Sequence, residues 1–170
     1  CYEKTVAIKP NFVDAYYNLG IALKKLGHLD AAVKSYKNAI AIKPDFVNAH
    51  NNLGNIFNEL GQLDAAVKCY EKTVAIKPNF SEAHNNLGNI LLKLKRPDEA
   101  LLSFELAIAI NPKMNFLSGN LLRTKMDLCI WDDLPNQLDE LIIKVNNNEK
   151  VIDPFNMLGL IDNPKIQRKT

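Results

Sequence analysis

The chain contains 170 residues, of which 47% are hydrophobic and 24% are charged, and its net charge is +2. This balance is typical of a soluble globular domain, and it excludes the strongly one-signed charge of many nucleic-acid-binding proteins. No stretch approaches the roughly 18 consecutive apolar residues of a membrane-spanning helix. We therefore expect neither nucleic acid nor a membrane as a partner.

Three cysteines, Cys1, Cys69 and Cys129, lie far apart in the sequence. Their odd number and wide spacing match neither a disulfide framework nor a zinc site. We interpret them as thiols in a reducing compartment, which favours a cytoplasmic location, and we expect no metal ion and no cofactor. Because the chain begins at Cys1 rather than at Met, we interpret it as a piece of a longer protein.

The first twelve residues, CYEKTVAIKPNF, recur unchanged as residues 69–80. The two copies are separated by two lengths of a shorter repeat, because residues 13–46, 47–80 and 81–114 align with one another in sequence. The sequence therefore predicts a half repeat at 1–12 followed by three full repeats, and a period of this length is typical of helical repeat proteins.

Each full repeat predicts two helices. In the second repeat, apolar residues recur at steps of three and four along the first helix: Ala49, Leu53, Ile56, Phe57 and Leu60. Gly54 lies inside this helix, as do its equivalents Gly20 and Gly88, although an internal glycine costs about 1 kcal/mol relative to Ala. We interpret these glycines as points where the paired helix approaches too closely for a Cβ atom.

Turn residues separate the two helices of each repeat. Gly27 and Gly61 are candidates for the left-handed residue that follows a helix end. The next helix is expected to begin at an N-cap that recurs once in each repeat: Asp30, Asp64 and Asp98. In the third repeat Lys95-Arg96-Pro97 replaces the glycine-containing turn, so we expect this turn to have a different shape.

These positions together resemble the tetratricopeptide-repeat family. The shared signature comprises Leu19-Gly20, Leu53-Gly54 and Leu87-Gly88, the alanines Ala32, Ala66 and Ala100, the aromatic residues Tyr36, Tyr70 and Phe104, and the prolines Pro10, Pro44, Pro78 and Pro112. The resemblance covers residues 1–114. It implies an all-α, right-handed superhelical solenoid of antiparallel helix pairs that binds other proteins.

The period is not recognisable after residue 114, although helical spacing of apolar residues continues over 116–130 and 134–145. We expect capping helices and a junction in residues 115–170. Three segments resemble the corresponding junction of the O-linked N-acetylglucosamine transferase family: CIWDD at 129–133, VIDPFNMLGLIDNP at 151–164 and KIQRK at 165–169. This resemblance implies that the repeats recruit substrates for a catalytic domain that lies beyond Thr170.

Asparagines recur on the first helices at helical spacing. The candidate peptide-binding residues are Tyr17 and Asn18 in the first repeat, Asn51, Asn52 and Asn55 in the second, and Asn85, Asn86 and Asn89 in the third. A side-chain amide offers donors and an acceptor together, so it can pair with the N–H and C=O groups of an extended peptide. The transferase resemblance implies this role for the residue before each Leu-Gly pair, which is Asn18, Asn52 or Asn86. Alternatively, the asparagines form a solvated face in an Asn-rich chain.

Other functions remain open alternatives. A general assembly scaffold without any transferase would carry the same repeats, and self-association through the half repeat at 1–12 is possible. Catalysis by this chain is not expected, because it shows no nucleophile–base pair, Gly-rich phosphate loop or cluster of metal ligands. His50 and His84 occupy an aromatic position of the repeat, so we interpret them as packing residues.

Overall fold

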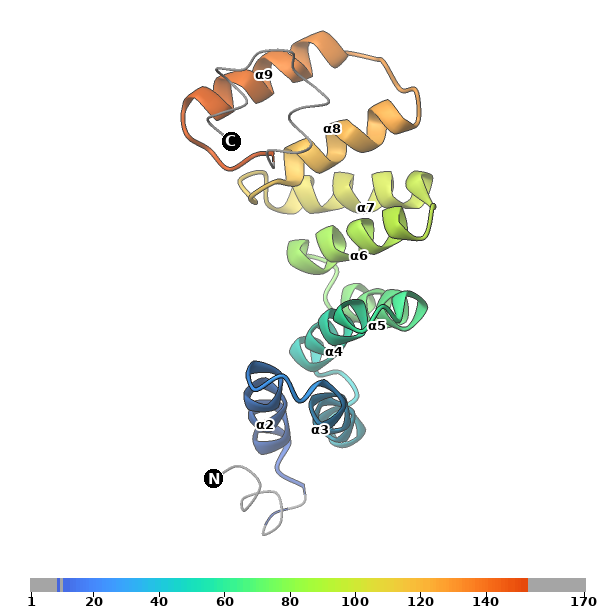
Figure 1. Cartoon of the computed structure of the whole chain (residues 1–170), viewed down its shortest axis with the longest axis vertical. Helices are drawn as coiled ribbons and strands as arrows, with labels where there is room; N and C mark the ends of the chain where they lie inside the picture. Colours follow the sequence, from blue (N-terminus) through green and yellow to red (C-terminus); the bar gives the residue numbers. More distant parts are fainter. Residues whose placement is uncertain (1–8, 10, 153–170) are drawn as a thin grey trace. The chain divides into compact units, whose positions relative to one another are not determined.

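The computed structural model describes residue 9 and residues 11–152, whose regular secondary structure consists of eight helices (Figure 1). In chain order they are α2 (Val13–Lys25), α3 (Leu29–Ile42), α4 (Val47–Glu59), α5 (Leu63–Ile76), α6 (Ser81–Lys93), α7 (Pro97–Ile110), α8 (Leu117–Asp127) and α9 (Leu134–Asn146). The predicted all-α repeat fold is confirmed. The chain divides into two compact units, Cys1–Asn79 and Phe80–Thr170.

Unit 1 contains two antiparallel helix pairs, α2 with α3 and α4 with α5, and α3 also packs against α4 (Figure 1). Ala32, Tyr36 and Ala39 of α3 are fully buried and form one core with Leu53 and Ile56 of α4. The small alanines let the helix backbones come close, while the aromatic and branched residues fill the space between them. In unit 2, α6 pairs with α7 in the same way, and α7 also packs against α8.

The internal glycines lie against aromatic rings of the paired helix. A Cβ atom at Gly20 would lie 2.7 Å from Cε1 of Tyr36, and one at Gly88 would lie 2.7 Å from Cε1 of Phe104. These distances are too short for any real carbon contact. The prediction of close approach is therefore confirmed, and the group that requires the space is a buried ring.

The turn at Lys95 has the same backbone form as the glycine turns. Lys95 has φ of +60°, compared with +79° at Gly27 and +70° at Gly61. The Lys95 N–H donates to the Leu92 carbonyl at 3.0 Å, as the Gly61 N–H does to Asn58 at 3.1 Å. The expectation of a differently shaped turn was wrong, because the bonds that end the helix require a left-handed residue whatever its side chain.

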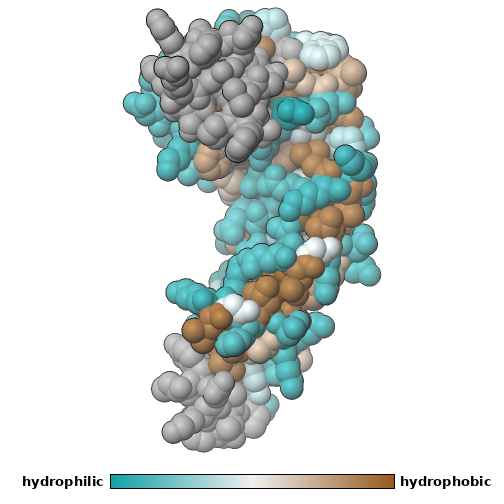
Figure 2. All heavy atoms as spheres, viewed as in Figure 1, coloured by the Kyte–Doolittle hydropathy of each residue, from teal (hydrophilic) through white to brown (hydrophobic). Residues whose placement is uncertain are grey.

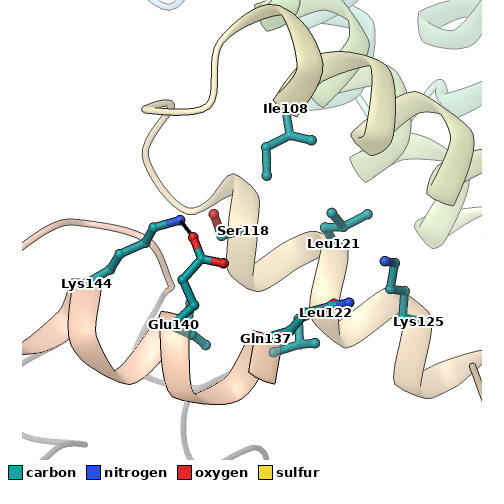
Figure 3. A pocket seen from close by; sticks show the side chains of 9 residues that line it. Ile108, Ser118, Leu121, Leu122, Lys125, Gln137, Glu140 and Lys144 are labelled. Atoms are coloured by element: carbon teal, nitrogen blue, oxygen red, sulfur yellow. Dashed lines mark ion pairs between the residues drawn. The ribbon is translucent and has the colours of Figure 1, made fainter. Parts of the chain in front are cut away.

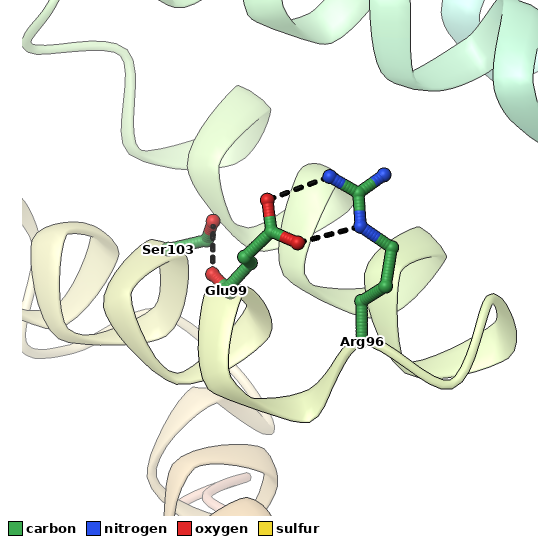
Figure 4. Close-up of polar contacts among 3 residues, drawn as sticks. All are labelled: Arg96, Glu99 and Ser103. Atoms are coloured by element: carbon green, nitrogen blue, oxygen red, sulfur yellow. Dashed lines mark hydrogen bonds and ion pairs between the residues drawn. The ribbon is translucent and has the colours of Figure 1, made fainter.

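Arg96 and Glu99 stabilise the start of the helix that follows this turn (Figure 4). The guanidinium donates through Nε and Nη2 to the two carboxylate oxygens of Glu99, each at 2.6 Å. The Arg96 guanidinium lowers the pKa of Glu99 through this hydrogen bonding. Ser103 Oγ donates to the Glu99 carbonyl at 3.0 Å one turn further along α7.

Lys95→Gly should stabilise unit 2 by about 1 kcal/mol. A residue with a side chain in the left-handed region costs roughly 1–2 kcal/mol, and glycine removes this cost. Part of the gain is lost because glycine increases the conformational entropy of the unfolded chain. Urea unfolding followed by circular dichroism measures the change. The matched control is Lys93→Gly, at the end of α6 in helical backbone, which should destabilise the protein by about 1 kcal/mol. Equal losses from both substitutions would contradict the strain at Lys95.

The second helices begin earlier than predicted. They start at Leu29, Leu63 and Pro97, and no side chain caps them by a hydrogen bond. The expected N-caps Asp30, Asp64 and Asp98 instead lie in the first helical turn. The prediction of N-caps was wrong, since the left-handed turn leads directly into the helix. The carboxylates still favour the helix by their proximity to its positive N-terminal end.

The repeat period continues beyond residue 114 in the backbone. Cys129, which lies one full repeat after Lys95, has φ of +56°, and its N–H donates to the Met126 carbonyl at 3.0 Å. The Ile130 N–H donates to Lys125 at 2.9 Å, which repeats the bond from Arg96 to Leu91. The expectation that the period ends at residue 114 was therefore wrong for α8 and its turn. Leu122 stands where the earlier repeats have glycine.

The segment 150–152 packs on the N-terminal turn of α8. The Phe116 N–H donates to the Lys150 carbonyl at 2.6 Å, and the Gly119 N–H donates to the Val151 carbonyl at 2.8 Å. Leu122, Leu141, Val145, Val151 and Ile152 form a buried cluster that joins this segment to α8 and α9. The elements predicted after residue 152, and nearly all of the half repeat at 1–12, lie outside the described residues.

Candidate peptide-binding surface

Asn52 of α4 is half-buried, and two tyrosine hydroxyls hold its side chain. Its Nδ2 donates to Tyr17 Oη at 3.2 Å and to Tyr36 Oη at 3.4 Å. Both amide N–H groups are thus used within unit 1. The amide oxygen of Asn52 therefore retains the acceptor capacity that a bound chain would require.

Aromatic rings support this amide from α2 and from the segment before α4. The ring of Tyr17 lies 5.8 Å from that of Tyr36 and 4.9 Å from that of Phe46, measured between centroids. Tyr17 is half-buried, whereas Tyr36 is fully buried. Burial raises the pKa of Tyr36 to about 12, although its hydrogen bond with Asn52 acts in the opposite direction.

Above pH 10 the Tyr36 hydroxyl should weaken the fold. A tyrosine in the unfolded chain ionises with a pKa of about 10, whereas the pKa of Tyr36 in the folded protein is about 12. The neutral hydroxyl therefore makes its full contribution to stability below pH 10. That contribution is lost as the pH rises through 12. Between pH 9 and pH 11.5 the free energy of unfolding should therefore decrease less in Tyr36→Phe than in the unsubstituted protein. The difference between the two decreases should be about 1–2 kcal/mol. Parallel pH profiles from urea unfolding would contradict this assignment.

The other two candidates on α4 are already engaged within the protein. Asn51 is only 4% exposed, so its amide offers little surface to a peptide. Asn55 is half-buried, and its Oδ1 accepts a hydrogen bond from Tyr70 Oη at 2.7 Å. On α2, Asn18 is half-buried, and no side-chain hydrogen bond joins it to another described residue. Asn18 and Asn52 are therefore better placed than Asn51 and Asn55 to receive a ligand in unit 1.

In unit 2 the candidates Asn85, Asn86 and Asn89 are all half-buried on α6. The Oδ1 atom of Asn85 is buried and has no hydrogen-bond partner among the described residues. Asn89 Oδ1 accepts a hydrogen bond from Nδ2 of Asn120 at 3.3 Å. Asn120 was not among the predicted residues; it lies one full repeat after Asn86, but Leu122 stands at the position of the glycine that marks the other repeats.

His50 and His84 are buried, which agrees with their interpretation as packing residues. His50 is 9% exposed, and its Nε2 lies 2.9 Å from the Pro44 carbonyl oxygen, while His84 is 7% exposed. Within residues 11–152 no group of three or more His, Cys, Asp or Glu side chains is arranged to hold a metal ion. None of the described helices is both long and apolar enough to cross a membrane.

A small pocket lies between α7, α8 and α9 in unit 2 (Figure 3). Its volume is about 170 Å³, and Ile108, Leu121 and Leu141 contribute apolar side chains. Glu140 and Lys144 form an ion pair of 2.7 Å beside it. The pocket was not predicted, because its residues come from three helices whose packing is not evident in the sequence.

Models of one repeat family match the chain. A model described as TPR repeat matches residues 22–61 and 54–95, and two models described as Tetratricopeptide repeat match residues 1–34 and 81–114. Together they cover residues 1–114. Among curated proteins, none matches the chain.

Solved structures with a similar fold include MamA and YrrB. A MamA crystal structure has a TM-score of 0.79 at 19% identity, over 86% of this chain and 85% of MamA. MamA residues 41–end from Desulfovibrio magneticus RS-1 has a TM-score of 0.74 at 18% identity, over 83% of this chain and 80% of that one. YrrB, described as a TPR protein with an unusual peptide-binding site, has a TM-score of 0.77 at 16% identity, over 99% and 88%. These structures show the fold, and the repeat-family matches over residues 1–114 identify the chain as a tetratricopeptide-repeat protein.

Proposed function

We propose that this chain is a non-catalytic interaction module that binds extended polypeptide through Asn18 and Asn52 in unit 1 and Asn86 in unit 2. The observation that supports the proposal is the amide of Asn52, which two tyrosine hydroxyls orient while its oxygen keeps acceptor capacity. The likeness in fold to YrrB, described as having an unusual peptide-binding site, is consistent with this use.

Recurrence of asparagine on helices also supports the proposal. Asparagine lowers helix propensity by up to about 0.7 kcal/mol relative to Ala, yet it precedes the Leu-Gly pair in all three full repeats. A side-chain amide can pair with the backbone of any extended peptide, so binding should tolerate many sequences. Because each such bond adds only about 0.5–1.5 kcal/mol, the affinity should be weak.

A library of unstructured peptides tests this function by fluorescence anisotropy. Changing Asn18, Asn52 and Asn86 together to Ala should weaken binding by about tenfold or more, since each lost hydrogen bond contributes about 0.5–1.5 kcal/mol. The matched control changes three asparagines outside the first helices to Ala: Asn38, Asn79 and Asn136. Equal binding by both triple variants, with circular dichroism unchanged, would show that the candidate residues form only a solvated face.

The finer proposal is that the module recruits substrates for a protein O-linked N-acetylglucosamine transferase in a reducing, cytoplasmic setting. The resemblance of residues 129–133, 151–164 and 165–169 to that family's junction supports it. The coding sequence that follows Thr170 provides the test. A nucleotide-sugar transferase domain in the same frame would support recruitment, whereas a stop codon would favour a general assembly scaffold.

Self-association through the half repeat at 1–12 is a further proposal about partners. Sedimentation of the present chain and of a form extended by whole repeats separates the cases. A dimer that disappears on extension would support pairing through the half repeat, and a dimer that persists would contradict it.

A further inference from the structure

A groove in unit 1 is formed by α3, α4 and α5. Leu53, Phe57 and Cys69 contribute to an apolar floor, and the exposed lysines Lys37, Lys68 and Lys72 line the same groove. Its volume is about 520 Å³, which falls in the range of roughly 300–1,000 Å³ for ligand pockets. We call it the lysine groove. Figure 2 shows how apolar and hydrophilic side chains alternate on the surface in view.

The lysine groove lies on a different side of α4 from the asparagines. An α-helix turns by about 100° per residue, so Leu53 and Phe57 share one side of α4. Asn52 and Asn55 share another side, more than about 100° away. A ligand of the lysine groove would therefore occupy a surface separate from the candidate peptide-binding residues.

The groove carries positive charge that the described residues do not compensate. None of their carboxylates lines it, and none of its three lysines forms an ion pair with them. The Nζ atom of Lys37 lies 5.8 Å from the ring centroid of Phe57, which places one cation beside the apolar floor. Such an arrangement favours a ligand that has both negative charge and an apolar group.

The three lysines do not recur as a set at the equivalent positions of the neighbouring repeats. The equivalents of Lys37, Lys68 and Lys72 in the following repeat are Glu71, Leu102 and Leu106, and those in the preceding repeat are Glu3, Lys34 and Asn38. The lysines therefore come together at only one repeat of the sequence. A framework role would predict the same residue types in the neighbouring repeats.

We propose that the lysine groove binds an acidic peptide segment of another protein, with one large apolar side chain on the floor and carboxylates beside the lysines. The apolar side chain gains free energy by leaving water, and the carboxylates compensate the three cations. Basic segments would meet like charge, and uncharged segments would leave the cations uncompensated.

Cys69 provides a local reporter of binding. It is half-buried in the groove, and burial raises the pKa of its thiol to about 11, so it alkylates slowly at neutral pH. With Cys1→Ser and Cys129→Ser, it is the remaining thiol of the chain. A bound peptide that covers the floor should slow its alkylation by iodoacetamide further.

Three synthetic peptides separate charge from apolar contact. The first has glutamates around a central Phe, the second replaces that Phe by Ser, and the third replaces every glutamate by Lys. The first should protect Cys69 at the lowest concentration, the second should require more peptide, and the third should not protect. Higher salt should weaken protection by the first peptide, because exposed charges are screened over about 10 Å at 0.1 M ionic strength.

Changing Lys37, Lys68 and Lys72 together to Gln should raise the concentration of the acidic peptide needed for protection by roughly tenfold. For each variant, protection is measured relative to the rate of Cys69 alkylation without peptide. This reference is needed because the charge of Lys37 also lowers the pKa of the Cys69 thiol. The Asn18, Asn52 and Asn86 triple variant should be protected normally, which separates this proposal from the proposed function. Protection by the Lys peptide, unchanged protection of the Gln variant, or protection that needs only a second copy of the chain would overturn the proposal.

Discussion

Phe104→Ala should lower the free energy of unfolding of unit 2 by about 3–5 kcal/mol, because removal of a buried aromatic side chain leaves a cavity that the surrounding helices fill only in part. Phe104 is 0% exposed on α7 and lies against Gly88 of α6. Urea unfolding followed by circular dichroism measures the loss.

The matched control is Leu106→Ala on the same helix. Leu106 is 52% exposed, so its truncation should change the free energy of unfolding by no more than about 0.5 kcal/mol. Losses of similar size from the two substitutions would show that Phe104 is not the residue that holds α6 and α7 together.

Gly88→Val should destabilise unit 2 by about 1–3 kcal/mol, as overpacking in a filled core does. The added Cβ would lie 2.7 Å, 2.8 Å and 2.9 Å from three carbons of the Phe104 ring, so the ring or the helix must move. Chemical denaturation of the single variant measures the net cost, which is reduced slightly because Val has a higher helix propensity than Gly.

A double-mutant cycle isolates the contact between the glycine and the ring. In the Phe104→Ala background the ring is absent, so Gly88→Val should cost much less, with a coupling energy of about 0.5–3 kcal/mol. Gly61→Ala is a useful comparison, because no atom lies within 4 Å of its added Cβ and only its φ of +70° opposes the change. Additive losses at Gly88 and Phe104 would contradict a direct contact.

The helical pairs were predictable because the repeat presents its core residues at helical spacing and marks each turn. The close approach at Gly20, Gly54 and Gly88 was also predictable, since an internal glycine in a helix needs a compensating contact. The identity of that contact required the structure. Nothing in the spacing alone indicates that the ring of Tyr36, Tyr70 or Phe104 occupies the space.

The errors have a common physical origin in the backbone. At Lys95 and Cys129 the hydrogen bonds that end the first helix hold a left-handed residue, although neither side chain signals one. The same turn starts the next helix one residue before Asp30, Asp64 or Asp98, so these carboxylates do not cap it. The sequence thus predicted the positions of the turns more reliably than their backbone conformation and hydrogen bonds.

The candidate site was predictable only in outline. Spacing placed Asn18, Asn52 and Asn86 at equivalent positions, but it did not reveal that Asn51 is buried or that Asn52 bonds with two tyrosines. It also did not indicate Asn120, because Leu122 replaces the glycine that marks the other repeats. The lysine groove depends on three helices from two repeats, so it was not evident from any one segment.

The most direct measurement is a nuclear magnetic resonance titration that follows the side-chain amide signals of the asparagines as an unstructured peptide is added. Single Asn→Ala variants assign the signals of Asn18, Asn52 and Asn86. If these residues bind the peptide backbone, the amide signals of Asn18 and Asn52 in unit 1 should shift together, and the signal of Asn86 in unit 2 should also shift. Peptides of unrelated sequence should produce these shifts. Shifts confined to other residues, with these three signals unchanged at saturation, would contradict peptide binding by the asparagines.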